Sequence, residues 1–192
     1  MPQRGKKIQK SNKDVEGKTP SRLYNLIVYL IGGPISDEFE GLIISRTIQI
    51  RGNQTLEDLH RTIFKAFDRF DEHLYEFMLG VVPDDRSSIY SLPSEVEIPG
   101  LDEEMGGDVR TTNIDSLGLE VDRAFGYRFD FGDEWLHQID VTAIVDYSGK
   151  GKYPKVTKKV SKSPLSTLTR TMNSPGSLIF IFCYIFLLHV YL

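Results

Sequence analysis

The sequence contains a single cysteine, Cys183, among 192 residues. One thiol excludes an internal disulfide framework, and it excludes a thiolate cluster around zinc or an iron–sulfur centre. The chain also lacks a G-x-S-x-G nucleophile elbow, a phosphate-binding loop and a dinucleotide-binding fingerprint. With 40% hydrophobic and 26% charged residues, it is typical of a globular protein and unlike collagen, low-complexity disorder or a multi-span membrane protein. The length suits one domain with tails.

The net charge of −4 conceals an uneven distribution of charge along the chain. Residues 1–22 carry a net charge of +5 and residues 149–176 carry +7, whereas residues 23–148 carry −16. Because phosphate backbones repel an acidic surface, we do not expect the folded body to bind nucleic acid. The basic flanks are able to contact DNA or anionic lipid, and the simpler interpretation is that they are solvated and partly neutralise the body.

Changes in composition divide the chain into four segments. Residues 1–22 are rich in Lys, Gln, Ser and Asn and predict a disordered basic tail, which lacks the apolar core of a signal peptide. Residues 23–148 predict the folded domain, 149–176 a basic linker, and 177–192 an apolar C-terminal segment. We expect a cytoplasmic location, with a membrane tail anchor through residues 178–192 as the alternative.

The apolar run 178–192 has three interpretations, which stay open. As a helix, its fifteen residues would span about 22 Å, short of the roughly 30 Å hydrocarbon core, and would form a marginal anchor. The basic residues before it would favour a cytoplasmic linker. The abrupt change in composition also fits an altered gene end. The third interpretation is a docked helix or strand, and the Ile, Phe and Tyr content fits an aggregation-prone strand.

Apolar patterns predict two strands and a helix in the first part of the domain. Residues 23–31 are apolar on both faces, which predicts a central buried strand, and residues 41–50 are rich in β-branched side chains and predict a second strand. Thr55 and Asp58 match a capping box, so a helix is expected to follow and to end near Phe70. Its apolar stripe, expected to face a core, is Leu56, Leu59, Ile63, Ala66, Phe67 and Phe70.

The second part of the domain predicts more sheet. Residues 74–82 predict a strand, and the acidic, Gly- and Pro-rich residues 83–108 predict a surface insertion. Residues 124–131 and 135–145 predict a hairpin around the turn 132–134. One face of this hairpin is expected to lie in the interior: Tyr127, Phe129, Phe131, Trp135, His137, Ile139, Val141, Ala143 and Val145. The order of the elements predicts an α+β fold, a mixed β-sheet with one main helix packed across it in a β-grasp-like layout.

Three segments carry a resemblance to a known family. They are LEDLHRTI at 56–63, HLYEF at 73–77 and YRFDFGDEWLH at 127–137. They resemble the L-x-x-L-H-x-x-I helix, the H-L-y-x-F strand and the Y-x-Y-D-F-G-D-x-W-x-H hairpin of the plasmid pRiA ORF-three-like family, also labelled the IS-element passenger TnpR family. The resemblance covers about residues 23–164. It implies a compact α+β domain found on plasmids, beside mobile elements and in chromosomes, with no established reaction.

The TnpR label suggests a resolvase, whose nucleophile works inside a cluster of arginines. The arginines between Arg46 and Arg128 occur singly among the acidic residues of the domain. We therefore expect no resolvase activity.

Three histidines and two aspartates fall within the motif segments. His60, His73 and His137, together with Asp130 or Asp133, offer the nitrogen and oxygen donors of a mixed metal site. No pair has the close spacing of a helical metal motif, so structural histidines with hydrogen-bond partners are the alternative. We leave the metal unassigned, and we expect no cofactor and no catalytic residue.

The hairpin turn offers a second choice between structure and ligand binding. Asp130 and Asp133 are able to cap the turn at Gly132 through bonds to backbone N–H groups. Alternatively, the two carboxylates beside Trp135 would suit a cationic or hydroxyl-bearing ligand. Trp135 itself is typical of a packing anchor.

Three functional hypotheses follow. The leading one is a small non-catalytic binding or interaction module, which contacts an unknown protein or small-molecule partner through its sheet face and its acidic insertion. The second is a metal- or ligand-dependent enzyme that uses His60, His73, Asp130, Asp133 and His137, and it requires those side chains to converge in one pocket. The third is a mobile-element accessory protein that touches DNA through its basic tails.

Overall fold

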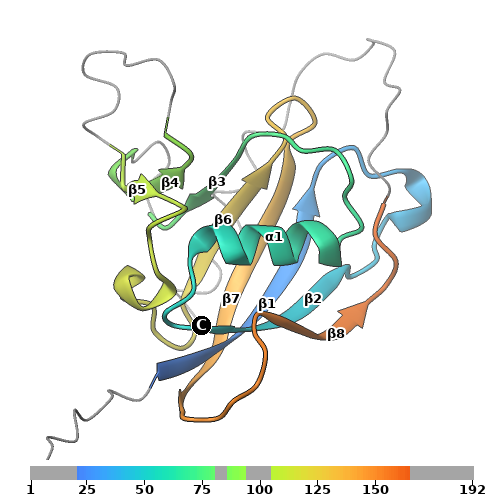
Figure 1. The fold of residues 1–192 in the computed structure, drawn as a ribbon. Helices are drawn as coiled ribbons and strands as arrows, with labels where there is room; N and C mark the ends of the chain where they lie inside the picture. Colours follow the sequence, from blue (N-terminus) through green and yellow to red (C-terminus); the bar gives the residue numbers. More distant parts are fainter. Residues whose placement is uncertain (1–20, 81–85, 94–104, 165–192) are drawn as a thin grey trace, which may run out of the picture.

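A single twisted sheet carries one α-helix across one face in the computed structural model, which describes residues 21–80, 86–93 and 105–164 (Figure 1). The strand order is β5-β4-β3-β6-β7-β1-β2-β8. The strands are β1 (Ser21–Gly32), β2 (Ser45–Arg51), β3 (Tyr75–Met78), β4 (Ile89–Ser91), β5 (Gly107–Asp108), β6 (Ala124–Phe129), β7 (Trp135–Tyr147) and β8 (Lys155–Val160). The helix is α1 (Leu56–Ala66), and short 3₁₀ turns are η1 (Asp37–Phe39), η2 (Arg86–Ser88) and η4 (Ile114–Leu117).

The sheet is mixed, as predicted. β4 and β5 run parallel, and the other neighbouring strands pair antiparallel, including the central pair β1 and β7. The α+β class and the single main helix are therefore confirmed, whereas the β-grasp label is not confirmed. The core lies between α1 and the sheet, where Leu26, Ile48, Phe77 and Phe125 are fully buried.

The predicted capping box starts α1. The Asp58 N–H donates to Thr55 Oγ1 at 3.2 Å, and the Thr55 N–H donates to Asp58 Oδ2 at 3.1 Å. The apolar stripe is buried from Leu56 through Phe67. The helix ends at Ala66 because Asp68 takes a left-handed φ of 57°, so the expected end at Phe70 is wrong and that side chain is 52% exposed.

The hairpin of β6 and β7 supplies most of the expected interior row. Trp135, His137, Ile139 and Val141 are all buried beneath the helix. After Val141 the positions that face the core shift by one residue. A register shift against β1 causes this change, because Thr142 has no paired residue on that strand. Ile144 therefore packs against the core, and the prediction for Val145 is wrong, since that side chain is 45% exposed.

Phe131 is a second correction to the predicted interior row. β6 ends at Phe129, and Asp130 takes a positive φ of 58°, which breaks the alternation of the strand. The Phe131 ring consequently lies in solvent with the Arg128 guanidinium carbon 4.4 Å from its centroid.

Three of the predicted segment boundaries also change. Residues 155–160 of the expected linker 149–176 form β8, which pairs with β2 at the sheet edge. The strand expected over 41–50 begins only at Ser45, so Leu42 is exposed. The ends of the predicted insertion 83–108 pair with each other as β4 and β5.

The predicted C-terminal apolar segment, 177–192, lies outside the described residues, as do residues 1–20 of the predicted N-terminal tail. Of the residues that the structure describes, none forms a helix long and apolar enough to span a membrane.

Candidate functional site

His60 lies on α1 and faces the aromatic side chains of the sheet. Its ring stacks on the Tyr75 ring with centroids 3.5 Å apart and planes 2° apart. Its Nδ1 shares a hydrogen bond of 2.8 Å with the Tyr127 hydroxyl. Burial lowers the pKa of His60 to about 4, with a smaller contribution from Arg61, so the ring is neutral at pH 7.

His137 lies deeper, on β7. Its ring packs edge-on against Phe67 at 4.8 Å and is tilted against Tyr127 at 5.3 Å. Burial lowers its pKa to about 3, and the Arg69 charge acts in the same direction. His137 is therefore a neutral imidazole within the core.

His73 and Asp130 meet at the outer end of the hairpin. His73 Nε2 is 3.5 Å from Asp130 Oδ2, and the imidazole is about half exposed. The other oxygen of Asp130 accepts hydrogen bonds from the N–H groups of Gly132 at 3.0 Å and Asp133 at 3.3 Å. This is the turn-capping geometry that the sequence offered as one of two interpretations.

Trp135 is fully buried and supports an arginine. The Arg69 guanidinium carbon lies 3.5 Å from the centroid of the indole, and Arg69 Nη1 donates to the Pro164 carbonyl at 2.9 Å. Burial lowers the pKa of Arg69 to about 10. Trp135 thus helps to hold the chain that follows β8 against the core.

The three sequence-predicted histidines all lie against one aromatic cluster of the sheet. His60 and His137 both contact Tyr127, whereas His73 pairs with Asp130. Among the described residues, no three His, Cys, Asp or Glu side chains lie close enough together to hold a metal ion.

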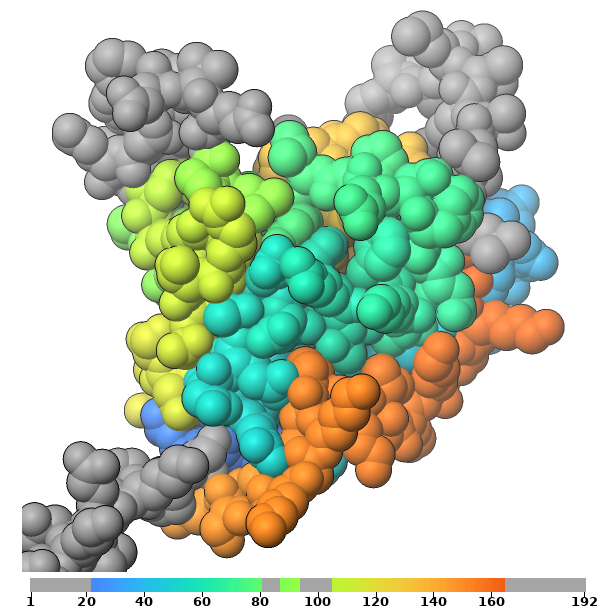
Figure 2. Space-filling model, viewed as in Figure 1, coloured from blue at the N-terminus to red at the C-terminus, as the bar shows by residue number. Residues whose placement is uncertain are grey.

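A cleft that the sequence did not predict lies on another side of α1. It has a volume of about 660 Å³ and is lined by Pro34, Ser36, Glu38, Phe39, Arg46, Asp68, Lys159, Ser161, Lys162, Ser163 and Pro164. These residues come from the η1 loop, from β2, from the end of α1, and from β8 and the residues after it. In Figure 2 the orange surface of β8 and its continuation runs beside α1 toward the light-blue η1 loop.

Arg46 is the most deeply buried charge in this cleft, at 1% exposed. Its Nε donates to the Ala66 carbonyl at 2.7 Å, at the C-terminal end of α1. Its Nη1 donates to the carbonyls of Ser45, Val160 and Ser161 at 2.7, 2.9 and 3.2 Å. The Phe67 ring lies 4.7 Å from the guanidinium carbon. Burial lowers the pKa of Arg46, and the nearby Asp68 opposes that shift.

One sequence signal would have revealed Arg46. Along β2 and the residue before it, the inward-facing positions are Ile44, Arg46, Ile48 and Ile50, and all four are buried. A charged residue in the apolar row of a strand needs a specific partner or a function, because burying a charge is costly.

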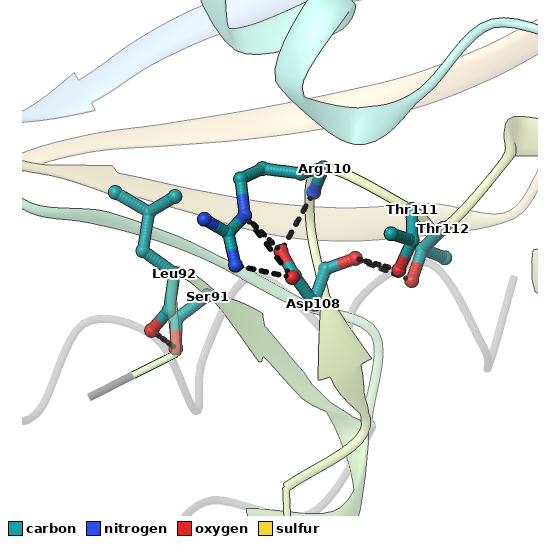
Figure 3. Close-up of polar contacts among 6 residues, drawn as sticks. All are labelled: Ser91, Leu92, Asp108, Arg110, Thr111 and Thr112. Atoms are coloured by element: carbon teal, nitrogen blue, oxygen red, sulfur yellow. Dashed lines mark hydrogen bonds and ion pairs between the residues drawn. The ribbon is translucent and has the colours of Figure 1, made fainter. Parts of the chain in front are cut away.

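A second polar cluster lies where the predicted insertion returns to the sheet (Figure 3). Both carboxylate oxygens of Asp108 accept hydrogen bonds from Arg110, whose Nη2 is 2.8 Å from Oδ2, and these bonds lower the pKa of Asp108. The Asp108 carbonyl accepts from the hydroxyls of Thr111 and Thr112. The cluster closes the turn after β5.

That turn also completes the start of α1. The carbonyls of Thr112 and Val109 accept the N–H groups of Leu56 and Glu57, both at 3.0 Å. These are first-turn donors that have no partner inside the helix. The contacts of this cluster are thus structural.

The fold defines an α+β domain in which one helix crosses a mixed sheet. Residues 38–168 match the family described as plasmid pRiA4b ORF-3-like protein. Since this match covers more than half of the chain, the protein belongs to that family. The family is uncharacterised, and the match supports neither the TnpR label nor a link to mobile elements.

A solved structure has a similar fold. It is a protein of unknown function from Methanosarcina mazei Go1, with 23% sequence identity and a TM-score of 0.57, and the match covers 77% of this chain and 74% of that one. At that identity the likeness shows the fold alone. No curated protein matches this chain.

Proposed function

We propose that this protein is a non-catalytic binding module, and that its ligand is a small molecule held in the cleft between η1, β2, the end of α1 and the residues after β8. The observation that carries the proposal is the cleft itself, whose floor contains the buried cation Arg46. Its volume of about 660 Å³ falls in the range of small-molecule sites, roughly 300–1,000 Å³.

The contacts of the sequence-predicted residues support a role without catalysis. His60 and His137 are neutral rings packed among aromatic side chains, and Asp130 caps a turn. General acid–base catalysis needs such groups to reach a shared substrate, and none of these three lines the cleft. A ligand role for these residues, and for His73, Asp133 and Trp135, stays a prediction, as do the β-grasp-like layout, the cytoplasmic location and DNA contact by the basic tails.

The test is native mass spectrometry of the full chain purified from its own host. Ser36 is exposed at the rim of the cleft, so Ser36→Trp introduces a large ring there. Ser116→Trp is the matched control, because Ser116 is also exposed and does not line the cleft. We expect a bound small molecule on the wild type and on the control, and its loss from Ser36→Trp.

Two outcomes would contradict the proposal. One is a small molecule retained equally by the wild type and both variants. The other is a wild-type chain that carries no small molecule and whose melting temperature is unchanged by a metabolite extract of the host.

A further inference from the structure

The charges of the cleft are unevenly paired. Lys159 Nζ lies 3.7 Å from Asp68 Oδ1, and both side chains are half exposed. Glu38 Oε1 accepts a hydrogen bond of 3.2 Å from the Ser36 hydroxyl at the exposed rim. The two acidic groups of the cleft are therefore peripheral, whereas the deepest charge is the Arg46 guanidinium.

In the described part of the chain, Arg46 has hydrogen-bond acceptors but no carboxylate in direct contact, and the Asp68 charge acts on it only at longer range. Within the described residues it donates to four backbone carbonyls through Nε and Nη1, and no carboxylate forms an ion pair with it. None of these bonds uses Nη2. Buried charges in proteins are ordinarily paired with an opposite charge, so a cation held this rigidly at a cleft is suited to receive an anion.

A second, independent observation points to the same ligand. Ser163 lines the cleft at 8% exposed, and its Oγ is buried without a hydrogen-bond partner among the described residues. A buried hydroxyl without a partner is unfavourable in the free protein. An oxygen atom of a bound ligand would satisfy it.

The backbone fixes the segment that carries this hydroxyl. Ser161 takes a left-handed φ of 57°, which turns the chain as it leaves β8. The Ser161 carbonyl accepts from Arg46 Nη1, and the Pro164 carbonyl accepts from Arg69 Nη1. The segment 161–164 is thus bonded at both ends to buried arginines, with Lys162 and Ser163 between them.

We infer that the ligand of the cleft carries a phosphate group, which pairs with Arg46 and Lys162 and accepts a hydrogen bond from Ser163. This inference rests on the proposed function and names the chemistry of its ligand. A phosphate monoester has about two negative charges and three terminal oxygens, which match one guanidinium, one ammonium group and one hydroxyl. A carboxylate carries one negative charge, so it balances only one of the two cations.

The experiment is isothermal titration of the full chain with inorganic phosphate and, separately, with acetate as a carboxylate probe, in a buffer free of both. Lys162→Gln and Ser163→Ala are the informative variants. Removing a charge-assisted bond weakens binding by about 10- to 100-fold, and removing the hydroxyl by about 2- to 10-fold. Lys158→Gln is the matched control, because Lys158 is an exposed lysine of β8 that does not line the cleft, and its phosphate affinity should equal that of the wild type.

Arg46→Gln tests the central contact, and circular dichroism reports whether that variant folds. If Arg46→Gln does not fold, Lys162→Gln and Ser163→Ala still test the inference. Phosphate that binds equally to Lys162→Gln, Ser163→Ala and the wild type would overturn the inference, and so would acetate that binds more tightly than phosphate. If phosphate fails to bind while a host small molecule is still lost from Ser36→Trp, the phosphate inference fails and the binding function stands.

Discussion

Acid should destabilise this protein through two buried histidines before its carboxylates protonate. Burial lowers the pKa of His60 to about 4 and that of His137 to about 3, so both rings are neutral in the folded state at pH 5. In the unfolded chain each ring takes up a proton below about pH 6.5. The unfolded state then binds more protons, and stability falls as pH falls from 6.5 toward the folded pKa values.

The magnitude follows from the same two pKa values. Each pH unit in this window costs about 1.4 kcal/mol per histidine, so the 1.5 units between pH 6.5 and 5 cost about 2 kcal/mol for each ring and about 4 kcal/mol for the pair. Against a typical stability of about 5–15 kcal/mol, this loss is easily measured.

Urea unfolding followed by fluorescence of Trp135, at pH 7, 6 and 5, measures this loss as a change in the extrapolated free energy of unfolding. His137→Leu should remove about half of the pH dependence, whatever its stability at pH 7. Ser116→Ala, at an exposed side chain that does not titrate, should keep the wild-type dependence. A free energy that stays constant between pH 7 and 5, or a dependence unchanged in His137→Leu, would refute this reasoning.

Three further predictions concern stability, and chemical denaturation checks each one. Thr55→Ala removes the hydroxyl that caps α1 and should cost about 1 kcal/mol, whereas Thr55→Ser should keep most of the wild-type stability. Gly33→Ala should cost about 1–3 kcal/mol or more, because Gly33 has a φ of 131° and a Cβ would lie 2.5 Å from Cε3 of Trp135; a neutral result would contradict this packing. Asp115→Ala removes the acceptor of Arg22 Nε and of the Tyr24 hydroxyl, both at 2.8 Å, and should lower the free energy of unfolding by about 1 kcal/mol. This loss should be smaller in high salt, because salt screens the Arg22–Asp115 ion pair.

Much of the fold was predictable because its signals are local. The capping box at Thr55 and the alternation from Trp135 to Val141 each lie within a few residues, and both appear in the structure as expected. The errors occur where a single residue changes the backbone. The positive φ of Asp68 ends α1 early, and the register shift at Thr142 turns Val145 outward. Neither the positive φ of Asp68 nor the register shift at Thr142 alters the spacing of apolar residues, on which the prediction was based.

The candidate site was harder to predict for the opposite reason. The sequence pointed to the motif histidines as candidate metal or ligand residues, because imidazoles bind metals and transfer protons. In the structure His137 is in the core and His60 stacks on Tyr75. The cleft instead depends on Arg46, whose only sequence signal is its place in an inward-facing row. One of its other walls comes from a segment that composition alone predicted to be a linker.

The sequence by itself determined the α+β class, the start of the helix and the interior face of the hairpin, because periodicity and capping act between residues that are near one another in the chain. Only the tertiary structure decided which polar groups from distant parts of the sequence meet. Arg46 and Ser161 are far apart in the sequence, and they come together because β8 pairs with β2. Strand pairing of that kind depends on the packing of the whole sheet, so the cleft appears only once the chain has folded.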